Sequence, residues 1–500
     1  MGFMTADRDQ TVILGYSLSD FIEKDSKPYF IVKLIKELDL DELYSRYSTQ
    51  GGEAYDPEIM LGILFLSYSE GITSSRKIER NCKKDMEFIY ISGKLRPDHC
   101  AISRFRQAHI DLLGRYFVEI VKIAKKRGIS DFGRLGIDGT KIQASCSKKK
   151  SYRERGIDKY IEGLEKDIKE YLRRCEEADE EELGGMEKKI EVLDKKREKL
   201  IERREELREA KKDLKAKDRE NHQINIVEPD AKMMIHSGGK GAPSYNGQIT
   251  VDTKSGIIIN NDAVQDRNDE KQFSKQYKKS EEILGEDKDR EYIADTGYSS
   301  FDEIKKVVEE EIEAYIGVGL EEKKETKEEL VKNGRKIKKT DFRYDKTGNY
   351  YECPNGERLE YKVDYKEGKR EISRYKTEKC SGCRLVKQCH SEKRSYGKYK
   401  IVERDKREAY IDVMLEKMSS NKGKEMMDIR RQTVEPVFGN LKSNLGFRRF
   451  NLRGLENVKG EFNLMCIAHN INKMYFLLLF FVHLMILRRI KIVKYLIGRL

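Results

Sequence analysis

Residues 133–145 read GRLGIDGTKIQAS, and this stretch decides the fold that the sequence predicts. Upstream of it apolar residues recur at helical spacing, whereas here a short apolar run reaches Asp138 and ends in glycine, as in a β-strand. Residues 245–264, YNGQITVDTKSGIIINNDAV, alternate around a Lys-Ser-Gly turn and predict a β-hairpin. A helix and two further strands are expected at 273–284, 290–295 and 313–319. This order of elements predicts a mixed α/β layer.

The first 130 residues predict a small helical domain. Apolar positions recur at helical spacing between residues 28 and 125, and Asp56 followed by Pro57 is a helix-start signal. The run 74–84, SSRKIERNCKK, and the helix expected after Pro97 are rich in basic residues. Charge alone suits a solvated helix face as well as a DNA-binding face.

A charged helical segment interrupts the strand pattern at residues 155–220. Its first arm repeats apolar residues every three or four positions, and its second arm repeats them at intervals of seven after Gly184 and Gly185. Two such arms predict an antiparallel coiled-coil hairpin that turns at the two glycines and is inserted after the first strand. The spacing does not distinguish a dimer contact from a rigid arm.

The composition favours a polyanionic partner. The 500 residues include 101 Lys and Arg against 89 Asp and Glu, a net charge of +12, and the length suits several domains. Hydrophobic residues make up 38% of the chain, which is enough to build folded cores. No secretory signal pattern is visible, so we expect a cytoplasmic protein without disulfides among its nine cysteines.

The C-terminal segment is unusually apolar. Residues 474–487, MYFLLLFFVHLMIL, precede a basic end. This run is shorter than the roughly 20 residues that cross a bilayer, so we expect a buried or partner-packing helix and no membrane span. Contact with a membrane surface is the alternative.

Three carboxylates from distant segments carry the candidate chemistry. Asp138 and Asp295 lie at or near the ends of predicted strands, and Glu435 is the one acidic residue in 430–450, RRQTVEPVFGNLKSNLGFRRF. Because a negative charge weakens a surface that only binds phosphates, Glu435 needs another role. Carboxylates supply the hard oxygen ligands that Mg²⁺ or Mn²⁺ requires, and two such ions serve phosphodiester displacement. Pro436 predicts a helix that begins near Glu435.

These motifs resemble a known family. The order IDGTKIQA, YNGQITVD, YIADTGYSS and RRQTVEPVFGNLKSNLGFRRFNLRG is similar to the DDE transposases of bacterial insertion sequences, in the group whose last motif is Y-x2-R-x3-E-x6-K. Arg431, Glu435 and Lys442 match this spacing, whereas Asp428 stands at the tyrosine position. The departure affects the DNA contact that the family's tyrosine makes and leaves the carboxylates unchanged. The resemblance covers most of residues 30–475.

The resemblance implies an RNase H-like catalytic core in which Asp138, Asp295 and Glu435 bind two Mg²⁺ or Mn²⁺ ions. Asp252 and Asp262 also lie near strand ends and are alternatives to Asp295. The aromatic and basic stretch at 447–453 suits a DNA backbone or an unstacked base, and a packed Phe pair with exposed arginines fits equally well. The residues expected to contact DNA are Arg431, Lys442, Arg448, Arg449, Arg453, Arg104 and Arg106.

A cysteine cluster forms the second candidate site. Cys353 is followed by Cys380 and Cys383 in a C-x2-C pair and by Cys389, with His390 next to it. This spacing predicts a small structural zinc site, because thiolates on a tight turn suit tetrahedral coordination. Free cytosolic thiols are the alternative.

We therefore expect a transposase that binds the terminal inverted repeats of an insertion sequence, hydrolyses the phosphodiester at the transposon ends and joins the 3′-hydroxyl to target DNA. It would act on double-stranded DNA as a homodimer in the bacterial cytoplasm, at the nucleoid. A DNA-binding relic without turnover and a nuclease of the same fold are the alternatives. The expected domains are a helical DNA-binding domain at 1–130, a core at 131–335 interrupted by the hairpin at 155–220, a cysteine module at 336–398, the C-terminal part of the core at 399–475, and a hydrophobic basic tail at 476–500.

Overall fold

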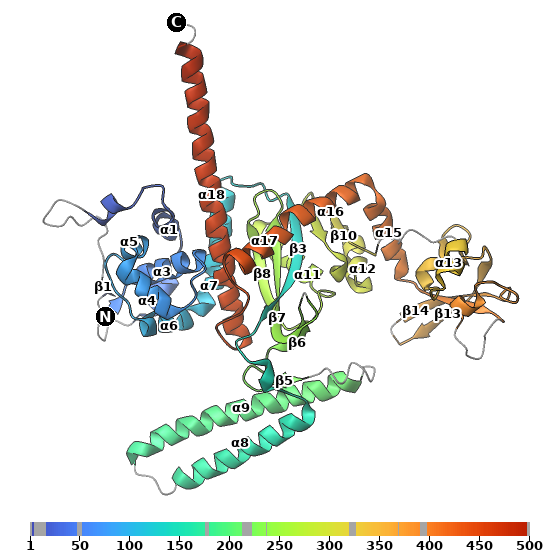
Figure 1. Cartoon of the computed structure of the whole chain (residues 1–500), viewed down its shortest axis with the longest axis horizontal. Coiled ribbons are helices and arrows are strands. Elements are labelled where there is room, and N and C mark those ends of the chain that lie inside the picture. Colours follow the sequence, from blue (N-terminus) through green and yellow to red (C-terminus); the bar gives the residue numbers. More distant parts are fainter. Residues whose placement is uncertain are drawn as a thin grey trace. The chain divides into compact units, whose positions relative to one another are not determined.

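The computed structural model describes residues 3–4, 17–47, 53–175, 180–212, 223–236, 238–319, 327–368, 370–390 and 398–497 (Figure 1). The chain divides into two compact units. One comprises Met1–Tyr292 and Ile429–Leu500, and the other comprises Ile293–Asp428. The first unit thus contains the N-terminal helices, most of the central sheet and the C-terminal helix.

The N-terminal part of the first unit is helical, as predicted. Helix α3 is buried around its whole circumference and forms the centre of this region. It begins where the sequence predicts, because Asp56 accepts a hydrogen bond from the backbone N–H of Glu58 at 2.9 Å and Pro57 occupies the first turn. The helices are α1 (Lys27–Ile35), α2 (Asp41–Ser45), α3 (Pro57–Ser69), α4 (Ser75–Lys84), α5 (Met86–Ile91), α6 (His99–Ala108) and α7 (Leu113–Lys126).

A helical hairpin follows the first core strand. Helices α8 (Glu154–Cys175) and α9 (Glu180–Lys212) lie side by side in Figure 1, and their shared core includes Ile161, Leu164 and Leu200. The predicted turn is wrong: Gly184 and Gly185 lie inside α9, and the connection falls at residues 176–179, outside the described part of the chain. Residues 213–220 of the predicted hairpin also lie outside it.

The central sheet contains the predicted strand at its middle. β3 (Arg134–Gln143) pairs antiparallel with β7 (Gly241–Asp252), which forms the predicted hairpin with β8 (Ile258–Val264). The strand order is β10, β9, β3, β7 and β6 (Lys232–Ile235), with β8 also paired to β7. The division between the two units falls within β9 (Glu291–Ala294). The mixed α/β architecture expected from the sequence is therefore present.

Helix α18 (Leu455–Ile497) anchors the sheet to the N-terminal helices, since it packs against β8, α3 and α7. Asn470 exchanges two hydrogen bonds of 2.8 Å with the backbone of Ile258 on β8. Gly247 on β7 allows this close approach, because a Cβ atom there would stand 2.9 Å from the ring of Phe462. The helix runs through the boundary at residue 476 where a separate tail was expected.

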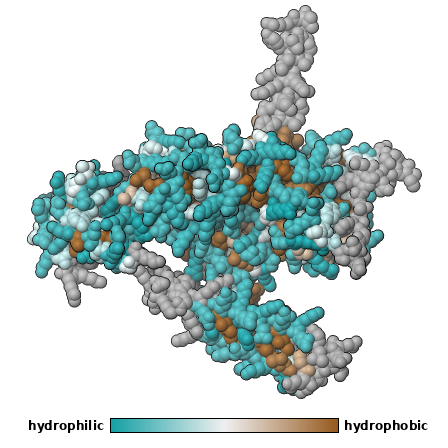
Figure 2. Space-filling view, turned by 180° about the vertical axis from the view of Figure 1, so that it is seen from behind, coloured by the Kyte–Doolittle hydropathy of each residue, from teal (hydrophilic) through white to brown (hydrophobic). Residues whose placement is uncertain are grey.

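Two aromatic side chains of α18 are largely exposed. Phe476 is 60% and Phe480 57% accessible. On the mostly hydrophilic face seen in Figure 2, hydrophobic side chains gather at the base of this helix. Among the described residues, no helix is both long enough and apolar enough to cross a membrane.

The second unit contains a five-stranded antiparallel sheet with an aromatic core. Tyr344, Tyr351 and Tyr375 pack against one another with ring centroids 5.0 to 5.9 Å apart. The sheet extends past residue 398, where the cysteine module was expected to end, because its last strand begins at Lys400. Its order is β11 (Arg343–Asp345), β12 (Tyr350–Glu352), β13 (Arg358–Glu367), β14 (Arg370–Thr377) and β15 (Lys400–Asp405). The unit also contains β10 (Ala314–Ile316) and the helices α12 (Phe301–Glu309), α13 (Lys327–Asn333), α14 (Val386–Cys389) and α15 (Glu408–Ser419). Helix α11 (Phe273–Leu284) belongs to the first unit.

Candidate active site

Asp138 lies on the central strand β3 and is only 9% exposed. Its Oδ1 accepts a hydrogen bond of 2.8 Å from the backbone N–H of Gly139. Two residues earlier, a Cβ atom at Gly136 would come within 2.2 Å of the side chain of Val434. The absence of a side chain at Gly136 therefore lets the segment before Glu435 lie directly on β3, and this brings two sequence-distant carboxylates to one place.

Glu435 begins α17 (Glu435–Gly439), with Pro436 in the first turn as the sequence predicts. The preceding helix α16 (Asn421–Thr433) ends two residues before it, so the local helix restart avoids the clash that an interior proline would cause. The Glu435 side chain is 56% exposed. It can therefore reach a ligand in solvent, unlike the enclosed Asp138.

Arg430 links the two carboxylates. Its Nη2 lies 3.0 Å from Oδ1 of Asp138, and its Nη1 lies 3.6 Å from Oε1 of Glu435. Arg430 is 5% exposed, whereas the neighbouring Arg431, which the motif spacing singled out, is exposed. The motif spacing does not indicate which of the two arginines is buried, because burial depends on tertiary contacts such as the ion pair of Arg430 with Asp138.

Lys442 lies beside the same strand. It follows α17 in a short π-helix (Asn440–Asn444), and its Nζ donates to the hydroxyl of Thr140 and to the carbonyl of Lys141 at 3.0 Å. Burial and the nearby Lys141 lower the pKa of Lys442, while the charge of Asp138 opposes this shift. The predicted pair of Glu435 and Lys442 thus lies near Asp138 in one unit.

Asp295 belongs to the second unit. It follows the last residue of β9, and its Oδ1 accepts a hydrogen bond of 2.8 Å from the backbone N–H of Gly297. Asp295 thereby caps a short 3₁₀ helix. Its two sequence alternatives have structural partners: Asp252 accepts from Ser255 at 2.5 and 2.7 Å within the hairpin turn, and Asp262 pairs with Lys279 at 2.7 Å. All three aspartates therefore have local partners, and the role of Asp295 stays a prediction.

A loop with three arginines follows the π-helix and lines the end of β3. Arg449 donates to the carbonyls of Ala144 and Cys146 at 3.0 and 2.8 Å, and Arg453 donates to the carbonyl of Ser145 at 2.9 Å. Arg448 similarly donates a hydrogen bond of 2.9 Å to the backbone carbonyl of Lys442. All three side chains remain exposed, so the backbone orients them without covering them.

The aromatic residues of this loop face the interior. Phe447 is 2% and Phe450 1% exposed, and Phe450 packs edge-on against Tyr245 with ring centroids 5.9 Å apart. The packed alternative is therefore correct, and neither ring is available to stack on a base.

Buried acidic residues that sequence analysis missed hold this loop. Glu461 is fully buried and accepts hydrogen bonds from the backbone N–H groups of Asn451 and Leu452 at 2.9 Å. Glu228 accepts from the N–H of Gly454 at 2.9 Å and from the hydroxyl of Tyr245 at 2.5 Å. Burial raises the pKa of both glutamates. Only their tertiary contacts identify them, since glutamates without such contacts are normally exposed.

The two arginines predicted to bind DNA on α6 differ in environment. Arg104 is exposed, whereas Arg106 is 7% exposed and donates to the hydroxyl of Tyr68 and to the carbonyl of Thr73, both at 3.0 Å. Arg106 thus stabilises the packing of α6 on α3, and its guanidinium is not presented to DNA.

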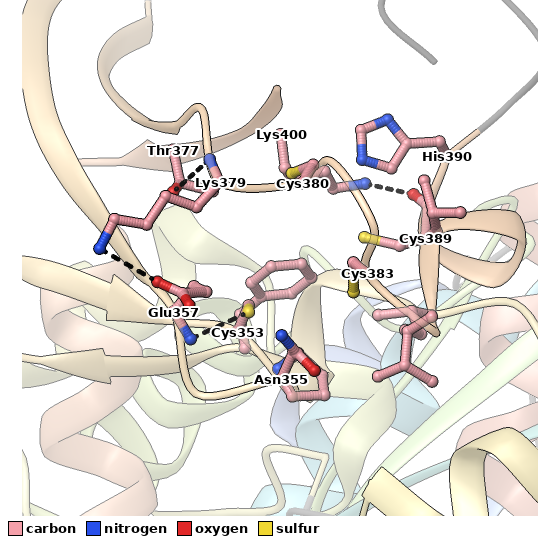
Figure 3. A pocket seen from close by; sticks show the side chains of 15 residues that line it. Cys353, Asn355, Glu357, Thr377, Lys379, Cys380, Cys383, Cys389, His390 and Lys400 are labelled. Carbon is pink, nitrogen blue, oxygen red and sulfur yellow. Dashed lines mark hydrogen bonds and ion pairs between the residues drawn. The ribbon is translucent and has the colours of Figure 1, made fainter. Parts of the chain in front are cut away.

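The cysteine site lies in the second unit. Figure 3 shows Cys353, Cys380, Cys383 and Cys389 around one cavity of about 30 Å³, with His390 at its border. Burial, and then the charge of the neighbouring thiols, raises the pKa of Cys380, and burial is also the main cause of the raised pKa values of Cys353 and Cys389. Within the described residues, no three His, Cys, Asp or Glu side chains are grouped closely enough to hold a metal ion. This holds for the thiols and for the carboxylates alike.

Comparisons with known proteins identify two segments. Residues 352–475, which include the cysteine site and Glu435, match the family model of a transposase DDE domain. Residues 16–108, which include α1 to α6, match a transposase domain known as DUF772. Asp138 and Asp295 lie outside both matched segments.

No curated protein sequence matches the chain. A solved structure of piggyBac transposase in a synaptic complex with hairpin DNA is similar over 90% of this chain and 75% of its own, with 12% identity and a TM-score of 0.31, too low to support an argument about the fold. Two segments of this chain are therefore similar to domains that are typical of bacterial insertion-sequence transposases.

Proposed function

We propose that this transposase binds the terminal inverted repeats of an insertion sequence, hydrolyses the phosphodiester at each end and joins the freed 3′-hydroxyl to target DNA. The observation that carries the proposal is the pair of Asp138 and Glu435. These residues lie about three hundred positions apart in the sequence, yet both contact one arginine at the central strand. No covalent protein intermediate is required.

The donor set suits hard divalent cations. Asp138 and Glu435 offer carboxylate oxygens that already share a cation, and we propose that Asp295 completes the set. Mg²⁺ or Mn²⁺ held by these residues would activate the attacking water or 3′-hydroxyl and stabilise the leaving oxygen. The carboxylates themselves would then orient the reacting phosphate relative to the basic side chains around them.

The basic residues would bind the DNA backbone. Each guanidinium carries five N–H groups, so Arg448, Arg449 and Arg453 retain free donors after binding one or two carbonyls. Lys442, with its ammonium beside Asp138, would bring a positive charge close to the reacting phosphate. Because the backbone has already oriented these arginines, little side-chain entropy is lost on binding.

We propose an RNase H-like arrangement for the core. Its support is a central β3 with an antiparallel hairpin on one side and strand-helix-strand connections leading away on the other.

The N-terminal helices supply a second DNA-binding surface. Exposed cations of α4 include Arg76, Arg80 and Lys83, which share one face with Glu79. Glu79 accepts hydrogen bonds from Lys83 and from the first residue of α6, His99, and these bonds lower the pKa of Glu79 to about 2. This contact ties the α4 cations to the start of α6.

Along α6, residues 100, 103, 104 and 107 form a stripe at helical spacing that contains Arg104 and Gln107. Arginine and glutamine suit guanine and adenine edges in the major groove. We propose that α6 reads base edges in the inverted repeat while α4 binds the adjacent phosphates.

We also propose that the working form is a homodimer, because the reaction requires two transposon ends held together. The hairpin of α8 and α9 would either pair two subunits or act as a rigid arm against flanking DNA. The family matches, typical of bacterial insertion sequences, support a cytoplasmic location at the nucleoid.

A structural zinc ion is a second proposal. A cavity of about 30 Å³ lined by four thiols has room for one small ion. To bind zinc, the thiols would have to move closer together than they lie in this structure and lose the protons that burial now favours. Such an ion would fix β12 relative to the turn before α14.

The test is cleavage and strand transfer on DNA that carries the flanks of this gene, with Mg²⁺ or Mn²⁺. The intact protein should give end-specific products, and Glu435→Gln should retain DNA binding without forming them. Binding without cleavage by either protein would favour a DNA-binding relic. Cleavage that ignores the ends would favour a nuclease of the same fold.

A further inference from the structure

Arg430 has a setting that the sequence motif does not explain. It occupies the last turn of α16, where the partial negative charge of the helix end also favours a cation. Its guanidinium is buried and makes ion pairs with Asp138 at 3.0 Å and Glu435 at 3.6 Å. One cation thus contacts two carboxylates that would otherwise repel each other.

The neighbouring Arg431 shows that this setting is specific. Successive helical residues differ by about 100° in direction, so the inward turn of Arg430 directs Arg431 outward. Both residues contribute the same charge to the surface potential. Arg430 lies at the position that a cation shared by the two carboxylates would occupy.

We propose that Arg430 is a positioning residue that stands in for a divalent cation between Asp138 and Glu435 and sets the affinity of this pair for metal. It holds the two carboxylates near each other when no ion is bound, and it must release at least one of them when an ion arrives. The inference rests on the proposed metal-binding function of Asp138 and Glu435.

The sign of the effect follows from electrostatics. A positive charge within 4 Å of both ligands repels an incoming divalent ion and competes for the same oxygens. Removing the charge should therefore tighten metal binding, even though it loosens the metal-free arrangement. A residue with a merely structural role would have the opposite effect, since its loss would disorder the ligands.

The experiment is calorimetric titration of the full chain with Mn²⁺. Arg430→Gln should bind Mn²⁺ about tenfold more tightly than the native protein. Arg431→Gln is the matched control, with the same change in charge one residue away, and should stay within about twofold of the native protein. Arg430→Lys retains the charge and should stay within about threefold.

Thermal melts provide a second measurement that does not depend on activity. Arg430→Gln should melt lower than the native protein without metal and gain more from added Mn²⁺. If Arg430→Gln does not fold, Arg430→Lys still tests the proposal, because tenfold weaker binding by that variant would contradict a role of charge alone. Equal or weaker Mn²⁺ binding by Arg430→Gln would overturn the inference. Absence of binding by every protein would overturn the proposed metal function as well.

Discussion

The carboxylate site and the cysteine site are both candidate metal-binding regions, and they are built differently. At the first, Arg430 and Lys442 balance the charge of the carboxylates, and Glu435 is largely open to solvent. At the second, four thiols line a small cavity, and burial raises the pKa values of Cys353, Cys380 and Cys389. From this difference we expect the proposed ion of the carboxylate site to exchange during a reaction, and the proposed zinc ion of the cysteine site to have a structural role.

The largest expected effect is on catalysis at the carboxylate site. Asp138→Asn should lower the rate of end cleavage by about a thousandfold or more, on the order of 4 kcal/mol of transition-state stabilisation, because it removes a charged ligand. DNA binding should persist, since the basic residues are unchanged. Single-turnover cleavage of labelled transposon ends measures the rate.

Asp262→Asn is the control for this substitution. It removes a carboxylate on β8 that pairs with Lys279 rather than with Arg430, so cleavage should change by no more than a few-fold. A rate loss as large as that of Asp138→Asn would show that removing any acidic residue of the sheet slows cleavage. The effect of Asp138→Asn would then not identify a specific carboxylate site.

A smaller effect, on stability, is expected at the cysteine site. Replacing both Cys380 and Cys383 with serine should abolish binding of one Zn²⁺ per chain and cost the second unit about 3 kcal/mol when zinc is present at a hundred times its dissociation constant. Metal content and denaturant titration measure these changes. Cys100→Ser is the control, because that exposed thiol lies on α6.

The comparison would fail if the double serine variant retained its zinc, or if it lost cleavage without losing stability. The first result would leave the cysteines as free thiols. The second result would indicate that zinc takes part in the reaction, contrary to the structural role proposed for it.

The pH dependence should separate the two regions further. For each buried thiol the folded pKa is raised, so the stability that the metal-free module gains from neutral thiols is present below the unfolded pKa and lost as pH rises through the folded value. Zinc requires thiolates, so its affinity should rise at least about tenfold between about pH 6 and about pH 8. Mn²⁺ binding by carboxylate oxygens should change much less over this range, because carboxyl groups in general titrate well below pH 6.

Competition with a chromophoric chelator at several pH values measures both affinities. Equal pH dependence of zinc and Mn²⁺ binding would contradict the assignment of the two ions to ligands of different chemistry.

The sequence predicted the local features of these regions better than their contacts. The strand through Asp138 and the helix start at Glu435 follow from short-range rules, apolar patterning for one and the position of Pro436 for the other. The hairpin turn was misplaced because Gly184 and Gly185 tolerate a helix when flanked by strong helix formers.

Long-range contacts could not be predicted in this way. The hydrogen bond that ties Glu228 to the basic loop joins residues 226 positions apart, and no periodicity encodes it. The inward turn of Arg430 rather than Arg431 depends on the contact of Arg430 with Asp138 on β3. Similarly, Arg106 is buried because its face of α6 meets Tyr68, which the basic composition of the helix does not reveal.

The smallest expected effect changes DNA binding without touching either metal region. Arg104→Gln removes an exposed cation of α6, so affinity for the transposon end should fall roughly threefold to tenfold and the salt dependence should lose about one unit of slope. Metal content and melting temperature should stay unchanged.

Arg106→Gln should instead lower stability by about 1 to 3 kcal/mol, because it removes a buried charge from its acceptors on Tyr68 and Thr73. Titration of labelled DNA at several salt concentrations, beside thermal melts of both variants, distinguishes the two arginines. Equal losses of affinity, with no loss of stability in Arg106→Gln, would mean that the burial of Arg106 does not prevent DNA contact.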